Sequence, residues 1–281
     1  MRRSTILCLS IFLIGVIAHA YIVSSRFIFE RVTQQHGKSS YSIEQEVTFR
    51  EGAESLIVKE IWLVADGGEM RVIASANGFK TFRLLKKKRV FWIDGGSERS
   101  DEMSDAYFMS PLLLRSATEE KKFFIKWNIL PEDILREKKP VKDLKLVKNE
   151  TEPFVRLART AGTVAYAFGE PAPVEGPLPA GLWIEQDEFT IRKMRTPDGS
   201  EFVGNDYAAF SKNLWYPKTQ NISFGNHQVS IRVTNLNSVE FSSEQKKQFD
   251  PGWVRNRPEL ATVWPKTNIS MQVQDFYKRF R

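Results

Sequence analysis

The sequence predicts an α+β fold built around one strongly curved antiparallel sheet of about eleven strands. Short runs of β-branched and aromatic residues follow one another along most of the chain, separated by glycine, asparagine and aspartate turns. A block near the middle instead clusters its apolar residues as helices do. Val164, Tyr166 and Phe168 alternate with Ala165 and Ala167, a large and small pattern that fits the concave side of a curved sheet.

The N-terminal segment has the pattern of a secretory signal peptide over residues 1–20. Arg2 and Arg3 form a positive start, residues 6–17 are almost entirely apolar, and the Ala-His-Ala sequence at 18–20 resembles a cleavage site. The sequence therefore predicts an exported, periplasmic protein. The apolar character continues through residues 21–23, so an uncleaved segment that anchors the protein to the inner membrane is the alternative.

Composition narrows the chemistry that the chain can perform. Its 281 residues include 41 lysines and arginines against 34 aspartates and glutamates, and the formal net charge of +7 is too small to indicate nucleic acid as a partner. The single cysteine, Cys8, lies inside the predicted signal peptide. Cleavage would leave no thiol for a nucleophile, a thiolate zinc site or an iron–sulfur cluster.

The mature chain is predicted to begin with a helix over residues 21–36, because Phe27, Ile28 and Val32 recur at helical spacing and Gly37 provides a stop. Strands follow it. The first group covers residues 43–50, 55–65, 69–76, 79–85 and 88–93. The short turns between them indicate an antiparallel meander.

The middle block predicts helices over residues 106–116 and 119–130, and Pro131 can open a further short helical turn. Strands resume beyond it, at residues 154–159, 163–168, 182–186, 189–195, 202–210, 214–224 and 228–235. The last of them has the clearest alternation, because Val229, Ile231 and Val233 are separated by polar residues. That strand is expected to have one wet and one dry face.

Motifs of catalysis are missing from the sequence. It contains no phosphate-binding glycine loop, no G-x-S-x-G elbow, no H-E-x-x-H and no calcium loop. His36 lies near the end of the first predicted helix and His227 in a hairpin, where a solvated turn histidine is the ordinary interpretation. We therefore predict that the protein is not an enzyme and has neither a cofactor nor a metal site.

The strands carry more large apolar side chains than one thin sheet face requires. They predict an apolar cavity between the sheet and the helical block, lined by Trp62, Phe82, Leu84, Trp92, Trp183, Phe189, Ile191, Met194, Val229, Ile231 and Val233. The middle block would supply a lid through Met109, Leu112, Leu113, Phe123 and Trp127. The alternative is an ordinary core beneath a permanently docked helix.

Several stretches together resemble one known family. They are an opening hairpin with a tryptophan (46–49 and 59–64), an aromatic strand (89–94), a lid-like segment (108–114) and a C-terminal part (182–195, then 216–217). The family is that of the periplasmic lipoprotein carrier and its outer-membrane receptor, the LolA/LolB-like proteins. The resemblance implies an incomplete β-barrel with a helical lid over an apolar cavity, which takes up acyl chains of lipoproteins or lipids and transports them towards the outer membrane.

The resemblance assigns residues 21–251 to one half-barrel domain and leaves residues 252–281, with Trp253 and Trp264, as a C-terminal extension. In the family an arginine shortly after the tryptophan strand latches the lid; residues 64–68 occupy that place here, and Arg71 is the nearest substitute. Members of the same fold also sense envelope stress. The alternative function is therefore a non-enzymatic regulatory module that binds a protein partner, with transient contact to a membrane or a membrane protein.

Overall fold

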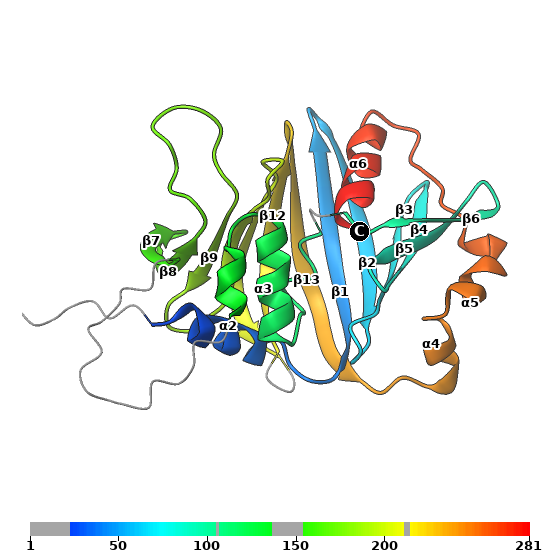
Figure 1. Ribbon diagram of the computed structural model, residues 1–281. Helices are drawn as coiled ribbons and strands as arrows, with labels where there is room; N and C mark the ends of the chain where they lie inside the picture. The colour runs from blue at the N-terminus through cyan, green and yellow to red at the C-terminus, as the bar shows by residue number, and fades with distance from the viewer. Residues whose placement is uncertain (1–22, 105–106, 137–153, 211–213) are drawn as a thin grey trace, which may run out of the picture.

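The computed structural model describes residues 23–104, 107–136, 154–210 and 214–281, so the predicted signal peptide and Cys8 lie outside the described residues. Within these ranges thirteen strands form one antiparallel sheet that is not closed into a barrel (Figure 1). The strands are β1 (Ser40–Glu51), β2 (Glu54–Val64), β3 (Met70–Ala76), β4 (Phe79–Lys86), β5 (Arg89–Asp94), β6 (Ser97–Glu102), β7 (Arg156–Thr160), β8 (Thr163–Phe168), β9 (Gly181–Glu185), β10 (Ile191–Arg195), β11 (Glu201–Ala209), β12 (Trp215–Phe224) and β13 (His227–Val239).

Two meanders make up the sheet, and they join where the first strand pairs with the last. The order across the sheet is β6-β5-β4-β3-β2-β1-β13-β12-β11-β10-β9-β8-β7. Antiparallel pairing of β1 with β13 brings Val47 opposite Ile231 and Phe49 opposite Val229. The predicted class, a single antiparallel sheet with helices against it, is confirmed.

The strand that the sequence prediction missed is β6. Its residues are serine, glutamate, arginine and aspartate, and most of them are exposed. It forms on the edge that β5 offers, with Phe91 opposite Ser100 and Ile93 opposite Glu98. A strand without buried apolar side chains carries no hydrophobic pattern from which it could be predicted.

The helices are α2 (Ser25–Gln34), α3 (Ala117–Lys126), η1 (Glu132–Leu135), α4 (Ser243–Lys247), α5 (Pro251–Arg255), η3 (Pro258–Leu260) and α6 (Ser270–Phe280). The first three confirm the helices predicted over 21–36 and 119–130 and the turn after Pro131. The helix predicted over 106–116 is wrong, because its described part forms turns. Pro111 lacks an amide donor, and the apolar side chains around it are buried on several sides rather than along one stripe.

The face that carries α6 is concave. β4 and β12 stand five places apart in the sheet order, which would separate them by about 24 Å in a flat sheet. Phe79 of β4 nevertheless contacts Tyr277 of α6 at 5.1 Å between ring centroids, and Phe224 of β12 contacts Phe276 at 6.2 Å. The sheet must therefore curve around this helix.

The C-terminal extension reaches both faces of the sheet. α5 lies against β5 and β6 on the outer face, whereas α6 lies inside (Figure 1). The chain passes between them where β4 and β5 diverge: Val263 pairs with Lys80, and the Thr262 amide donates to the Ile93 carbonyl at 2.9 Å. Trp264 then stacks on Phe79 at 5.7 Å.

Candidate functional site

Helix α6 packs its apolar side into the concave face. Val273, Phe276, Tyr277 and Phe280 recur at intervals of three and four residues and are fully buried. Phe276 meets Phe49 of β1 edge-on, with 5.2 Å between ring centroids. These side chains occupy the hollow in which the sequence predicts an apolar ligand.

A carboxylate lies in the middle of this apolar contact. Glu60 of β2 is 1% exposed. Its Oε2 accepts hydrogen bonds from Gln45 Nε2 at 2.7 Å and Trp62 Nε1 at 2.9 Å. Its Oε1 accepts from Tyr277 Oη at 2.7 Å and Arg281 Nε at 3.1 Å. The sheet and the α6 segment thus each supply two donors to one buried anion.

The surroundings of Glu60 keep it ionised. Burial alone would raise the pKa of Glu60, but Arg281 and the hydrogen bonds from Trp62, Tyr277 and Gln45 outweigh it and lower the pKa below its ordinary value. The Arg281 guanidinium is buried as well and lies over the Trp62 ring at 5.2 Å. Removing either member of this pair would leave a desolvated charge without compensation.

Residues 107–114, the predicted lid segment, cover the C-terminal end of α6. Phe108 stacks on Phe280, with 5.4 Å between ring centroids. Tyr216 Oη donates to Met109 Sδ at 3.2 Å. The predicted lid residues Met109, Leu112, Leu113 and Trp127 are all buried, and Phe123 is half-buried beside Trp127. The segment is packed closed against the sheet and α6.

An arginine fastens the end of the lid segment. Arg115 donates through Nη1 to the Asp66 carbonyl at 2.9 Å and through Nη2 to the Ser39 carbonyl at 2.5 Å. Arg71 lies buried on β3, and within the described residues its Nε has no partner. The arginine that bonds sheet and lid therefore stands on the lid segment, and the sheet supplies the carbonyls.

Most residues predicted to line the cavity share the concave core. Trp62, Phe189, Ile191, Met194, Val229 and Ile231 are buried there, and Trp92 and Val233 pack against its edge. They are joined in one cluster with α6, α2 and α3. That they contact a ligand stays a prediction.

Three predicted cavity residues point elsewhere, which corrects their assignment. Phe82 and Leu84 belong to a separate cluster on the outer face, where Phe82 lies 6.0 Å from Trp253 of the extension. β4 alternates, so its opposite side chains, Arg83 among them, face inward. Trp183 points away from the core residues on either side of it in β9, and Lys193 lies over its ring at 5.3 Å.

Two buried ionisable groups flank the lid. His36, expected to be solvated, is 4% exposed; its Nδ1 hydrogen-bonds to the Leu114 carbonyl, and burial lowers its pKa from 6.5 to about 4. Glu120 of α3 is fully buried, and within the described residues neither carboxylate oxygen has a hydrogen-bond partner. Burial raises the pKa of Glu120 well above its ordinary value.

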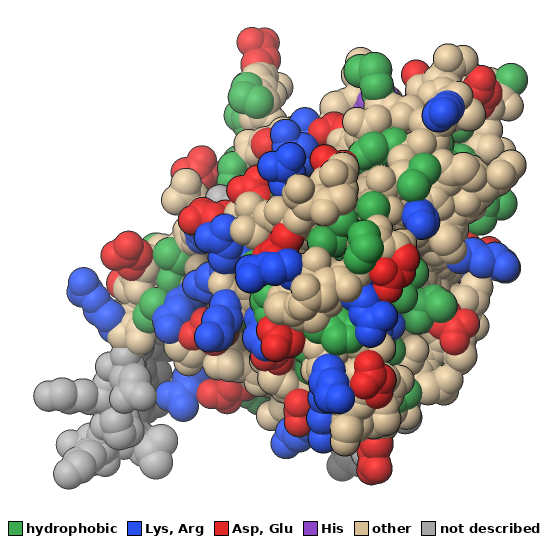
Figure 2. Space-filling view, turned by 90° about the vertical axis from the view of Figure 1, so that its right-hand side faces the viewer, with side chains coloured by type: hydrophobic (Ala, Val, Ile, Leu, Met, Phe, Trp, Pro, Cys, Tyr) green, Lys and Arg blue, Asp and Glu red, His purple; other side chains and the backbone are tan. Residues whose placement is uncertain are grey.

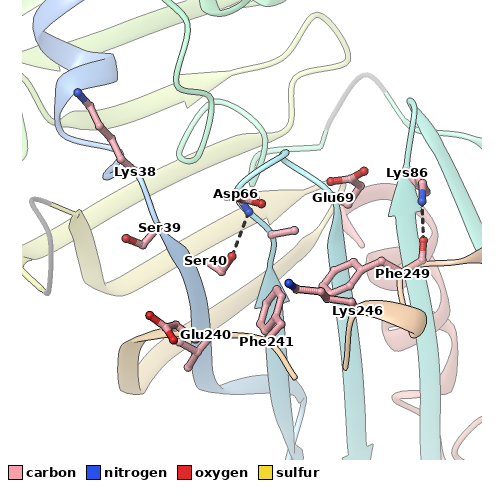
Figure 3. Close-up of a pocket in the computed structure, with 12 residues that line it drawn as sticks. Lys38, Ser39, Ser40, Asp66, Glu69, Lys86, Glu240, Phe241, Lys246 and Phe249 are labelled. Carbon is pink, nitrogen blue, oxygen red and sulfur yellow. Dashed lines mark hydrogen bonds between the residues drawn. The ribbon is translucent and has the colours of Figure 1, made fainter. Parts of the chain in front are cut away.

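The larger of two pockets lies outside the concave face. It has a volume of about 630 Å³ at the junction of β1, the β2–β3 turn and the chain around α4. Figure 3 shows lysines and carboxylates around it, with Lys86 Nζ donating to the Phe249 carbonyl at 2.9 Å and the Asp66 amide to Ser40 Oγ at 3.2 Å. Most of the residues that line this groove are polar or charged. A smaller pocket of about 240 Å³ lies between β4–β6 and α6, beside Arg83, Trp92 and Trp264.

The surface beside β6, α4 and α5 mixes basic and acidic side chains instead of gathering one sign (Figure 2). In the part of the chain that the structure describes, no group of three or more histidine, cysteine, aspartate or glutamate side chains is placed to hold a metal ion. None of the described helices combines the length and the apolar character needed to cross a membrane.

The polar centre of the site was not predicted from the sequence. Glu60 carries a signal that could have found it, because Val58, Glu60 and Trp62 share one side of β2 while Ile57, Lys59 and Ile61 are exposed. A carboxylate at an inward position needs a buried partner. That partner, Arg281, is distant in the sequence and no local pattern indicates it. The apolar spacing over 273–280 was a second signal, of an amphipathic helix.

An open curved sheet with helices packed into its concave face defines a half-barrel fold. No family model matches the sequence, and no curated protein matches it. The solved structure of a LolA superfamily protein from Nitrosomonas europaea matches over 83% of this chain and 100% of its own, with a TM-score of 0.51 and 10% identity. The chain therefore has a LolA-like fold, as the sequence resemblance predicted.

Two further solved structures were found. One is a putative outer membrane lipoprotein-sorting protein domain from Vibrio parahaemolyticus, with a TM-score of 0.47 and 10% identity over 82% of this chain and 98% of its own. The other is a DUF1329 family protein from Desulfovibrio piger, with a TM-score of 0.46 and 10% identity over 83% of this chain and 100% of its own.

Proposed function

We propose that this protein binds acyl chains of lipids or lipoproteins in its concave face, without chemistry, and that helix α6 leaves this face when the ligand enters. The protein would act in the periplasm and pass its ligand towards the outer membrane. The observation that carries the proposal is the apolar side of α6, which fills the hollow of a LolA-like half-barrel. The segment occupies the volume that a bound chain would need.

The energies of the two occupants are comparable. Burying the four large side chains of α6 contributes roughly 2 kcal/mol each. An acyl chain contributes about 0.8 kcal/mol for each buried methylene, so about ten methylenes match the apolar contact of the helix. A ligand with two or three long chains would exceed it. Exchange of this kind needs only that the ligand bind the open state better than the closed one.

Helix α6 is built to be exchangeable. It spans only Ser270–Phe280, and no side chain caps its N-terminus at Ile269. An isolated helix shorter than about 12 residues is marginal in water, so its order depends on the sheet. The contacts of Thr262 and Val263 with β4 and β5 would keep the released segment tethered.

The test is binding of a fluorescent long-chain fatty acid to a chain whose α6 is weakened from its outer side. Gln274 is exposed on α6, so Gln274→Pro breaks the helix without altering a side chain of the concave face. We expect the affinity of Gln274→Pro to exceed that of the matched control Gln274→Ala at least tenfold, because less energy is spent on releasing α6. Equal affinities, together with no lipid in native mass spectra of the purified protein, would refute the proposal.

A second function, recognition of a protein partner, is favoured by one specific observation. The occupant of the concave face is a helix, and Arg281, the residue that follows it, pairs with Glu60. The same face could therefore accept a helix from another polypeptide.

A further inference from the structure

The polar centre of the concave face limits what can replace α6. If α6 leaves, Glu60 keeps its bonds to Gln45 and Trp62 but loses those to Tyr277 and Arg281. A hydrocarbon has no donor with which to replace them. A buried carboxylate that loses its cation is strongly destabilising, so an occupant that supplies a positive charge at this depth is preferred.

The end of α6 is recognised by a second group. Arg83 of β4 is buried and stacks over Trp92 at 5.2 Å, and its Nη1 lies 3.5 Å from the Arg281 carbonyl. Burial lowers the pKa of Arg83 to about 10, and the nearby Asp94 carboxylate opposes this shift. A cation at the last carbonyls of a helix interacts favourably with the helix dipole. The face thus holds an anion for a basic side chain and a cation for a helix C-terminus.

We propose that the groove beneath α6 is an acceptor site for a basic amphipathic helix of a partner polypeptide, selected by Glu60, and that α6 occupies this site when the partner is absent. The inference rests on the proposed exchange of α6. The partner helix carries large apolar residues at the spacing of Val273, Phe276 and Phe280, followed directly by an arginine or lysine.

A helix fits these groups better than a cationic lipid does. A lipid amine could pair with Glu60, but it brings no helix C-terminus to Arg83, where the Arg281 carbonyl lies now. The aromatic contacts of Phe49, Phe79 and Phe224 with α6 are also spaced for side chains along a helix. The outward residues Met271, Gln274 and Lys278 are exposed, so the partner's other face is free to be polar.

The experiment measures binding of a labelled synthetic peptide of residues 265–281 to the full chain carrying Gln274→Pro, by fluorescence anisotropy. Three peptides are compared: the native one, Arg281→Lys and Arg281→Gln. We expect the native and Arg281→Lys peptides to bind roughly 30-fold or more tighter than Arg281→Gln. In a receptor that also carries Glu60→Gln, the preference should fall below about threefold.

Each other outcome overturns the proposal in a distinguishable way. If the three peptides bind equally, the groove responds to apolar area alone. If no peptide binds but the fluorescent fatty acid does, the helix-acceptor site is wrong while the proposed acyl binding stands; if neither binds, both are wrong. If dodecylamine but no peptide binds in a Glu60-dependent manner, the occupant is a cationic lipid. If the Glu60→Gln receptor fails to fold, the affinities of the three peptides for the Gln274→Pro chain decide between these outcomes. The same ranking is then measured on the unaltered chain.

Discussion

Helices α5 and α6 belong to one C-terminal extension, yet opposite faces of the sheet hold them in different ways. α5 starts with local signals: Asp250 accepts from the Gly252 amide at 2.9 Å, and Pro251 takes the first helical position. α6 has no such cap. Its order depends on residues that are distant in the sequence.

The surfaces beneath the two helices differ in whether a charge is buried in the contact. α5 rests on apolar side chains such as Phe82 and Leu84, and its ion pair, Arg255 with Glu98 at 2.7 Å, lies at the surface. α6 buries its ion pair with Glu60 inside the apolar contact. An apolar contact accepts any occupant of suitable shape, whereas a buried carboxylate specifies the charge of its occupant.

The largest expected effect concerns the buried Arg281–Glu60 pair, which is compared with the exposed Arg255–Glu98 pair. Arg281→Ala should lower the free energy of unfolding by about 3–5 kcal/mol, because Glu60 is left buried without its cation. Arg255→Ala on the outer face is the matched control and should have no measurable effect. Urea denaturation followed by circular dichroism measures both. Similar losses in the two variants would remove the distinction between the faces.

The concave side should also respond to pH through His36, which lies beside the lid. Its pKa is about 4 when folded against an ordinary 6.5, so the unfolded chain binds the proton first as the pH falls. The contribution of neutral His36 to the free energy of unfolding is fully present above pH 6.5. It declines by about 3 kcal/mol as the pH falls towards 4. Denaturation curves at several pH values, compared with those of His36→Gln, measure the decline. An identical pH dependence in both proteins would contradict the assignment.

A cap on the outer side should contribute less. Asp250→Ala removes the side-chain acceptor at the start of α5 and should cost about 1 kcal/mol, whereas Asp250→Asn keeps an acceptor and should cost less. The same denaturation assay measures both. An equal loss in the two variants would show that the cap contributes little.

The smallest expected effect is a gain in stability inside the concave core. At neutral pH the raised pKa of Glu120 means that folding opposes its ionisation, so Glu120→Gln should raise the Tm by roughly 1–2 °C. Glu119→Gln, at the neighbouring exposed position, is the control and should leave the Tm unchanged. A fall in Tm for Glu120→Gln would indicate a partner for this carboxyl.

The strands of the sheet could largely be predicted because their signals are local. Alternation along β13 and the turns between the early strands place them within a few residues. The face that each side chain takes was less predictable in β4. Phe82 and Leu84 stand at one parity and Thr81, Arg83 and Leu85 at the other, and both sides are buried. Which side is inner depends on α5 and on Phe241 and Phe249, which cover the outer one.

The site itself could be predicted only in part. The apolar residues of the concave core are visible in the sequence because hydrophobic side chains at inward positions are frequent and periodic. Glu60 and Arg281 belong to no such pattern. They are far apart in the chain, and their meeting depends on the extension passing between β4 and β5.

The sequence by itself determined where most of the strands and turns and the capped helices α2 and α3 form, because periodicity and capping act over a few neighbouring residues. Only the tertiary structure decided that the hollow of the half-barrel holds a helix of the same chain. Long-range contacts are selected by burial and charge compensation in the assembled fold, and these are properties of residues that become neighbours only on folding.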